Sequence, residues 1–115
     1  EYILYFIYHI SIRHKCQKIN LIKTMEDILY QTLSNDNSLF LIDLHKSKNI
    51  ADALDQLEKG LFFAFKNKIK YCRVVYGIGE GILKKDVVAN LKKHLLIYDF
   101  REGNSGGDCI VVIGL

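Results

Sequence analysis

The chain has 115 residues and a mass of 13.3 kDa, which is enough for one domain with a buried core but excludes a catalytic domain joined to a separate cofactor domain. Half of the residues are hydrophobic, a quarter are charged and the mean hydropathy is +0.07, which excludes a disordered chain. The formal net charge of +3 is compatible with a polyanionic partner, although a solvated lysine-rich face gives the same balance.

The three cysteines, Cys16, Cys72 and Cys109, are an odd number without a CxxC pair. This pattern predicts neither a disulfide framework nor a zinc site. Cys72 and Cys109 each lie inside an apolar run, where a free cysteine usually behaves as a small buried hydrophobe. We therefore expect a reducing compartment and a cytoplasmic protein.

The N-terminal stretch "EYILYFIYHISI" is apolar but too short to span a bilayer, so we expect no membrane partner. Its basic residues follow the apolar run, whereas the basic residues of a secretory signal precede it. The only methionine, Met25, stands at the start of a helix predicted over residues 25–33 with Thr24 as its N-cap. One hypothesis is that translation starts at Met25 and that residues 1–24 are an upstream extension.

The turn residues "SNDNS" separate an N-terminal extension, residues 1–38, from a domain over residues 39–115. In the domain, the short apolar run at 39–45 predicts a buried strand. Asn49 is a good N-cap for an amphipathic helix over residues 50–66. The apolar stripe of this helix consists of Ile50, Ala53, Leu54, Leu57, Leu61, Ala64 and Phe65.

Three aromatic residues near the end of this helix, Phe62, Phe63 and Phe65, have two interpretations. They could form a platform on which nucleic-acid bases stack, but the rings of such a platform would have to be exposed. We predict instead that these rings belong to the hydrophobic core.

The second half of the domain repeats the alternation of strand and helix. A strand is predicted over residues 69–76, a helix over 83–95, and two further strands over 96–100 and 109–115 around a glycine-rich turn. The second helix has one apolar stripe of Leu83, Val87, Leu91 and Leu95. The β-α-β-α-β-β order predicts an α/β two-layer sandwich, a mixed four-stranded sheet with both helices on one face, because right-handed crossovers place consecutive helices on the same side.

The loop "VYGIGEG" contains Gly77, Gly79 and Gly81. A dinucleotide fingerprint would need a glycine where Ile82 stands, and a Walker loop would need a lysine there. Asp99 follows at about the place of a ribose-binding acid, but too few residues come after it for the further strand and helix units of a dinucleotide fold. A purely structural interpretation is that the glycines permit a tight turn and close packing.

Asp43 and His45 lie two residues apart on the first predicted strand, so their side chains point to the same face about 7 Å apart. A carboxylate and an imidazole at a strand end can orient one another, activate water or hold a phosphate-bound metal. If the first two strands are parallel neighbours, His45 lies near the glycine loop, at the edge where ligands gather in open α/β sheets. His9, His14 and His94 show no ligand spacing.

Two segments, "LIDLHKSKNIADALDQLEKGL" and "RVVYGIGEGILKKDVVANLKKH", together resemble the Smr (small MutS-related) domain. The hallmarks of that family are an L-D-L-H-G motif that ends the first strand and an H-G-x-G-x-G loop that leads into a helix. The closing "SGGDCIVVIGL" is similar to the family's glycine turn and last strand, so the resemblance covers residues 39–115. It implies a two-layer α/β domain that binds nucleic acid and, in a number of members, nicks DNA or cleaves RNA, in some cases at stalled ribosomes.

The resemblance also implies site residues. Asp43 and His45 match the first motif and are expected to be catalytic, with His45 as acid or base and Asp43 fixing its tautomer or holding Mg²⁺ or Mn²⁺. Two positions depart from the family pattern, since Lys46 replaces the glycine of the first motif and Tyr76 replaces the histidine of the second. The residues expected to contact phosphate are Tyr76, Gly77, Gly79, Gly81, Lys84, Lys85 and Lys46.

Three functions follow from these observations and stay open at this point. The leading hypothesis is an endonuclease that acts on RNA or DNA. The replacement of the histidine by Tyr76 favours a non-catalytic module that binds nucleic acid or the ribosome, because tyrosine is a poor acid or base near neutral pH. The third is a protein-interaction domain that uses residues 1–10 as an edge strand or a partner helix.

Overall fold

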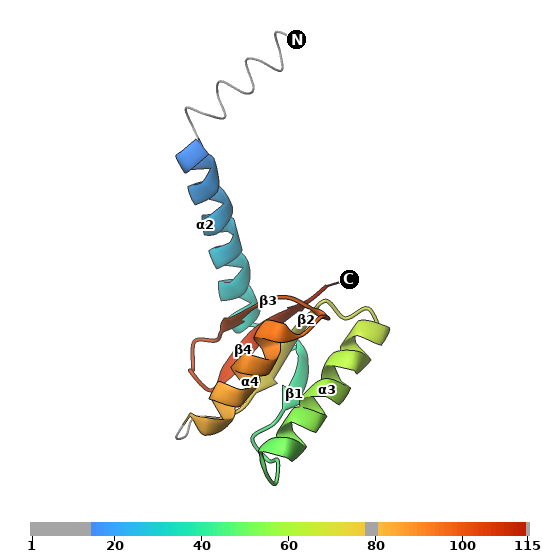
Figure 1. Cartoon of the computed structure of the whole chain (residues 1–115). Helices are drawn as coiled ribbons and strands as arrows, with labels where there is room; N and C mark the ends of the chain where they lie inside the picture. Colours follow the sequence, from blue (N-terminus) through green and yellow to red (C-terminus); the bar gives the residue numbers. More distant parts are fainter. Residues whose placement is uncertain (1–14, 78–80, 115) are drawn as a thin grey trace. The chain divides into compact units, whose positions relative to one another are not determined.

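The computed structural model describes residues 15–77 and 81–114, with side chains from residue 23 onward. The chain forms two compact units, Glu1–Thr32 and Leu33–Leu115. Helix α2 (Lys15–Ser34) is longer than the helix predicted from Met25 (Figure 1). Thr24 therefore lies inside α2 and is not its N-cap, because neither proline nor glycine interrupts the stretch before it.

The segment 1–10, which the interaction hypothesis uses as a strand or helix, lies outside the described residues. Within the described part of the chain, no helix is long and apolar enough to cross a membrane.

The unit that begins at Leu33 has the β-α-β-α-β-β order that the sequence predicts. Its four strands are β1 (Phe40–Asp43), β2 (Tyr71–Val75), β3 (Ile97–Glu102) and β4 (Asp108–Ile113). They form one sheet in the order β1-β2-β4-β3, in which β1 and β2 are parallel and β4 is antiparallel to both of its neighbours. The predicted mixed four-stranded sheet is confirmed.

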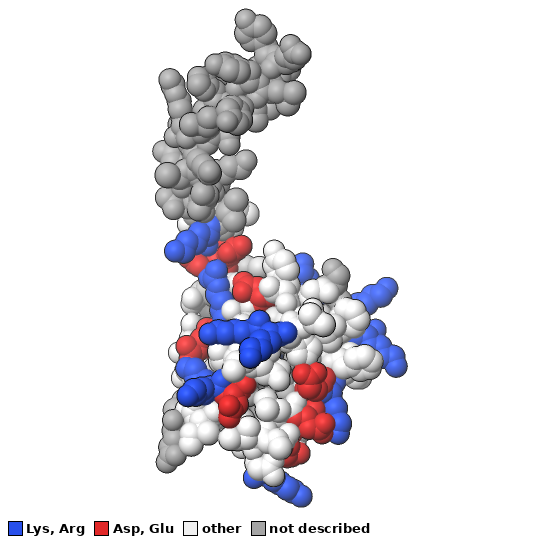
Figure 2. Space-filling model, viewed as in Figure 1, with Lys and Arg blue, Asp and Glu red and all other residues white. Residues whose placement is uncertain are grey.

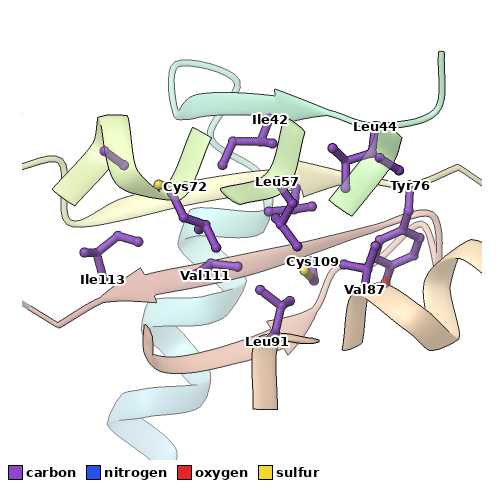
Figure 3. Close-up of a cluster of buried hydrophobic side chains, with 14 residues drawn as sticks. Ile42, Leu44, Leu57, Cys72, Tyr76, Val87, Leu91, Cys109, Val111 and Ile113 are labelled. Carbon is purple, nitrogen blue, oxygen red and sulfur yellow. The ribbon is translucent and has the colours of Figure 1, made fainter. Parts of the chain in front are cut away.

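Helices α3 (Ile50–Lys66) and α4 (Ile82–Lys93) cover one face of this sheet, as predicted (Figure 1). Asn49 is the N-cap of α3, and its side-chain oxygen accepts a hydrogen bond from the Asp52 N–H at 2.7 Å. The core between the layers is made by alternate strand residues and the inner helix stripes (Figure 3). Its buried members are Ile42, Leu44, Ala53, Leu57, Leu61, Ala64, Cys72, Val74, Tyr76, Val87, Leu91, Cys109, Val111 and Ile113.

The aromatic residues at the end of α3 lie outside the core. Phe62, Phe63 and Phe65 are 60%, 51% and 39% exposed, so the prediction that these rings are buried is wrong. Helix α3 approaches the sheet so closely that a Cβ on Gly60 would lie 2.8 Å from the Ile42 side chain. The inner side of the helix is filled by Ala53, Leu57, Leu61 and Ala64, and the three rings lie on its other sides.

Helix α4 ends two residues earlier than predicted, at Lys93, and Leu95 is 98% exposed and not part of the apolar stripe. His94 follows as the C-cap with an extended backbone. Its Nδ1 accepts a hydrogen bond from the Leu96 N–H at 3.1 Å, so the neutral ring carries its proton on Nε2, which lies 2.9 Å from a Glu58 carboxylate oxygen. This hydrogen bond joins the end of α4 to α3.

Candidate active site

The C-terminal ends of β1 and β2 meet at one edge of the sheet. Asp43 is paired with Val75 in the parallel register, and the Leu44 N–H donates to the Val75 carbonyl at 2.7 Å. This pairing brings His45, the residue after Leu44, close to Gly77. A Cβ on Gly77 would lie only 3.3 Å from the His45 Cβ. The histidine and the start of the glycine loop therefore lie together, as the strand order implies.

Asp43 and His45 form a hydrogen-bonded pair. Asp43 Oδ1 accepts hydrogen bonds from Nδ1 of the His45 ring and from the His45 backbone N–H, the latter at 3.2 Å. With the proton on Nδ1, Nε2 of the neutral ring has an available lone pair. The hydrogen bond from the His45 ring holds the pKa of Asp43 below its ordinary value. Leu44 between them is fully buried, so the two polar side chains face away from the helices.

A hollow of about 390 Å³ lies beside this pair. It is lined by the ends of β1 and β2 and by the turn that precedes β4, namely His45, Val75, Gly77, Ser105, Gly107 and Asp108. The turn reaches the site because Val75 and Asp108 are paired in the antiparallel register. Sequence reasoning did not select Ser105, Gly107 or Asp108 as site residues. Their only signal was the polar and glycine-rich "SGGD" directly before a strand.

The described glycines of the loop have different roles. Gly77 and Gly81 adopt φ angles of +85° and +82°, a left-handed conformation that strains other residues. The Gly77 N–H donates to the Gly107 carbonyl at 2.9 Å, so this amide is used inside the domain. Gly81 is the N-cap of α4 and supplies no side-chain acceptor for the first-turn N–H groups of the helix. Gly79 lies outside the described residues.

Tyr76 is part of the buried core (Figure 3). Tyr76 is only 5% exposed, and its hydroxyl donates to the Asp108 carbonyl at 3.1 Å. Burial, with smaller contributions from Cys109 and Asp108, raises the pKa of the hydroxyl to about 12. In contrast to the expectation from the sequence, the structure does not place Tyr76 among the residues that a bound phosphate could reach.

Lysines surround the site unevenly. Lys84 forms an ion pair with Glu102 of β3, so its charge is already partly balanced. Lys46 is exposed, directly follows His45, and adds to the lowering of the Asp43 pKa. Lys85 is exposed and lines a second hollow, of about 510 Å³, together with other lysines of α4. Figure 2 shows Lys and Arg side chains gathered over α4.

The turn that lines the hollow is held by a buried ion pair. Arg73 Nη1 donates to Asp108 Oδ2, and the Ser105 hydroxyl donates to Asp108 Oδ1 at 2.8 Å. The Arg73 and Asp108 side chains are only 17% and 8% exposed. Nη2 of the same guanidinium donates at 3.1, 2.9 and 2.9 Å to the carbonyls of Leu33, Ser34 and Asp36. Arg73 thus connects the turn before β4 to the first residues of the unit Leu33–Leu115.

The site offers few ligands for a metal ion. Among the described residues, no group of three or more His, Cys, Asp or Glu side chains is placed to hold one. Asp43 Oδ1 and His45 Nδ1 bind each other, so a divalent ion would meet Asp43 Oδ2 and His45 Nε2. The expected role of Mg²⁺ or Mn²⁺ stays a prediction.

Comparison with known proteins shows relatives of this fold and sequence. A crystal structure of the Smr domain of Thermus thermophilus MutS2 is similar in fold, with a TM-score of 0.63 and 21% identity over 67% of this chain and 100% of that one. A curated protein named Endonuclease MutS2, from Caldicellulosiruptor saccharolyticus, is 30% identical over an alignment of 87 residues that covers 70% of this chain but 11% of that protein. The family model of the Smr domain matches residues 42–115. The chain therefore belongs to the Smr domain family.

Proposed function

We propose that this Smr domain is an endonuclease that cleaves RNA or nicks DNA, with His45 as the acid–base group. The proposal rests on one observation above all, the hydrogen bond between Asp43 and His45 beside the hollow. The name of the similar protein from Caldicellulosiruptor saccharolyticus, an endonuclease, supports the same reaction class.

In the proposed reaction, His45 first removes a proton from the nucleophile. Asp43 keeps the Nδ1 proton in place, so that Nε2 accepts the proton of a ribose 2′-hydroxyl in RNA, or of a water molecule. The resulting oxygen attacks the phosphorus, and the bond from phosphorus to the leaving oxygen breaks. The imidazolium, stabilised by the Asp43 carboxylate, returns its proton to the leaving oxygen. Asp43 is a positioning residue in this scheme.

The scissile phosphate is proposed to lie between His45 and the first turn of α4. N–H groups and the positive end of the helix dipole favour an anion at such a helix start. Gly77, Gly79 and Gly81 would let the phosphate approach the backbone, and Gly77 leaves room beside His45.

Cations around the site would strengthen this binding. Lys46 and Lys85 are exposed and add positive charge at the two sides of the loop. Lys84 would take part only by exchanging its Glu102 partner for phosphate.

A non-catalytic nucleic-acid-binding module is the second candidate. Tyr76 favours it, because its buried hydroxyl, with a pKa of about 12, cannot supply a second acid or base near neutral pH. Such a module would use the same glycine loop and lysines but leave the phosphodiester bond intact.

A cleavage assay on the whole chain distinguishes the two candidates. Wild type and His45→Ala are incubated with labelled RNA and with supercoiled plasmid, in EDTA and in Mg²⁺ or Mn²⁺. We expect wild type to cleave at least one substrate and His45→Ala to be slower by at least about 100-fold, since this is the usual contribution of a general acid or base. Binding, measured in parallel by gel shift, should be nearly unchanged.

His94→Ala is the matched control, because His94 is also hydrogen-bonded to a carboxylate but does not line the hollow. Its cleavage rate per folded molecule should equal that of wild type. Salt-sensitive binding by wild type without any cleavage would favour the non-catalytic module. Cleavage by His45→Ala at the wild-type rate would exclude His45 as the acid–base group.

A further inference from the structure

The last turns of α3 present a surface that the proposed site does not use. We call it the Phe–Lys patch and define it as Phe62, Phe63, Phe65, Lys66 and Lys68. All five residues are exposed, and the three aromatic residues retain 60%, 51% and 39% of their accessible surface. Exposed apolar side chains that gather in one place, rather than singly, indicate a contact surface.

The rings of the patch are held in different ways. Phe63 stacks on Phe40 of the edge strand β1, with ring centroids 5.4 Å apart and an angle of 29° between the planes. Phe62 and Phe65 are three residues apart on the helix and are therefore neighbours on its outer surface. One ring is thus anchored on the sheet edge, and two adjacent rings are available to solvent.

The charge around the rings is positive. Lys66 and Lys68 form no ion pair within the part of the chain that the structure describes. The acidic residues on the outer side of the preceding turns are already paired, since Asp55 binds Lys59 at 2.9 Å and Glu58 binds His94 at 2.9 Å. Lys and Arg side chains project at the end of α3, at the right margin of the view in Figure 2.

From these observations we propose that the Phe–Lys patch binds single-stranded nucleic acid outside the cleavage site, with bases stacked on Phe62 and Phe65 and phosphates beside Lys66 and Lys68. Flat apolar rings next to unpaired cations match the two chemical parts of a nucleotide, the base and the phosphate. An apolar protein partner would need the rings but not the lysines.

The patch is near enough to the cleavage site for one strand to contact both. Seven residue steps of chain separate Lys68 from Val75, which lines the hollow, and extended chain of that length spans at most roughly 25 Å. The patch would select single strands, because bases paired in a duplex cannot stack on protein rings. This inference rests on the proposed function and adds a substrate class to it.

The absence of tryptophan from the sequence gives a direct test. Phe62→Trp in the full chain introduces a single fluorescent reporter in the patch, and Tyr98→Trp places the control reporter on β3, where Tyr98 is 81% exposed. Each variant is titrated with a labelled oligouridine of about 16 nucleotides, and tryptophan emission and label anisotropy are recorded together. We expect the emission of Phe62→Trp to be quenched as anisotropy rises, and that of Tyr98→Trp to remain constant.

A second pair of variants measures the contribution of stacking. Phe62→Ala combined with Phe65→Ala should weaken binding of the oligouridine by at least about fivefold, but should not weaken binding of an abasic strand of equal length. Tyr98→Ala is the matched control and should bind both strands as wild type does.

Three results would overturn the inference. If anisotropy rises while Phe62→Trp stays unquenched, the strand binds elsewhere, and the proposed function stands without the patch. If the tryptophan emission of Phe62→Trp changes when the protein is concentrated without nucleic acid, a second copy of the chain covers the patch. If wild type gives no anisotropy change at all, the patch does not bind single strands, and the proposed function is decided separately by the cleavage assay on RNA and plasmid.

Discussion

At the scale of single residues, His45 and Tyr76 follow neighbouring strands but are used in different ways. The His45 side chain is 47% exposed and is oriented by the Asp43 carboxylate. Tyr76 is 5% exposed, and its hydroxyl donates to the Asp108 carbonyl. This difference is the reason that we propose His45 for proton transfer and a structural role for Tyr76.

The role of Tyr76 is testable with Tyr76→Phe. The variant loses one buried hydrogen bond, so its free energy of unfolding should decrease by about 1 kcal/mol, measured by urea denaturation. Cleavage per folded molecule should stay at the wild-type rate, because the hydroxyl does not reach the hollow. A variant as stable as wild type that has lost cleavage would instead place Tyr76 in the reaction.

The pH dependence of stability provides an independent test of the burial of the Tyr76 hydroxyl. The pKa of Tyr76 is raised from 10.0 to about 12 in the folded protein, so its contribution to stability is full below pH 10 and decreases as the pH rises toward 12. Cys72 and Cys109, with pKa values raised by burial to about 11 and about 12, act in the same direction. The alkaline loss of stability should therefore be smaller in Tyr76→Phe than in wild type, but not absent.

At the scale of elements, the wall of the site depends on one arginine of β2. Arg73 binds Asp108 at the start of β4 and also donates to three carbonyls between Leu33 and Asp36. Only a planar guanidinium has enough donors in the right directions for both tasks. The position of the turn before β4 is therefore coupled to the residues that begin this unit.

We predict that Arg73→Lys lowers the free energy of unfolding by about 2 to 3 kcal/mol, because an ammonium group cannot replace both sets of hydrogen bonds. Urea denaturation measures this loss. Lys92→Arg, an exchange of one cation for another at an exposed position of α4, is the control and should change stability by less than about 0.5 kcal/mol. Equal effects of the two substitutions would contradict the role of Arg73.

The sequence of helix α3 predicted where the helix lies but not which of its side chains are exposed. The N-cap Asn49 and the span of the helix were predictable, because capping and periodicity are local properties. The exposure of Phe62 and Phe63 was not, since apolar residues occur on more than one side of the helix. At Gly60 the helix approaches the sheet closely, and which of the apolar sides faces the sheet depends on tertiary packing.

At the scale of the whole molecule, strand order determines what surrounds His45. The sequence allowed the expectation that His45 lies near the glycine loop if the first two strands are parallel neighbours, and β1 and β2 do form that parallel pair. The insertion of β4 between β2 and β3 brings Ser105 and Gly107 to the hollow. The presence of Ser105 and Gly107 at the hollow could not be predicted, because the glycine turn before β4 does not specify that β4 will pair with β2 as well as with β3. The same pairing gives Gly107 as the acceptor of the Gly77 N–H.

The central claim is that Asp43 and His45 act as one unit in phosphodiester cleavage. The most direct test is a double-mutant cycle on the single-turnover cleavage rate, with wild type, Asp43→Ala, His45→Ala and the double variant at saturating protein. Introduced into wild type, Asp43→Ala should lower the cleavage rate by at least about tenfold, the usual effect of losing a positioning group. In the His45→Ala background the same substitution should change the rate by less than about threefold, because its partner is already gone. Losses that multiply in the double variant, or a wild type that does not cleave, would contradict this claim.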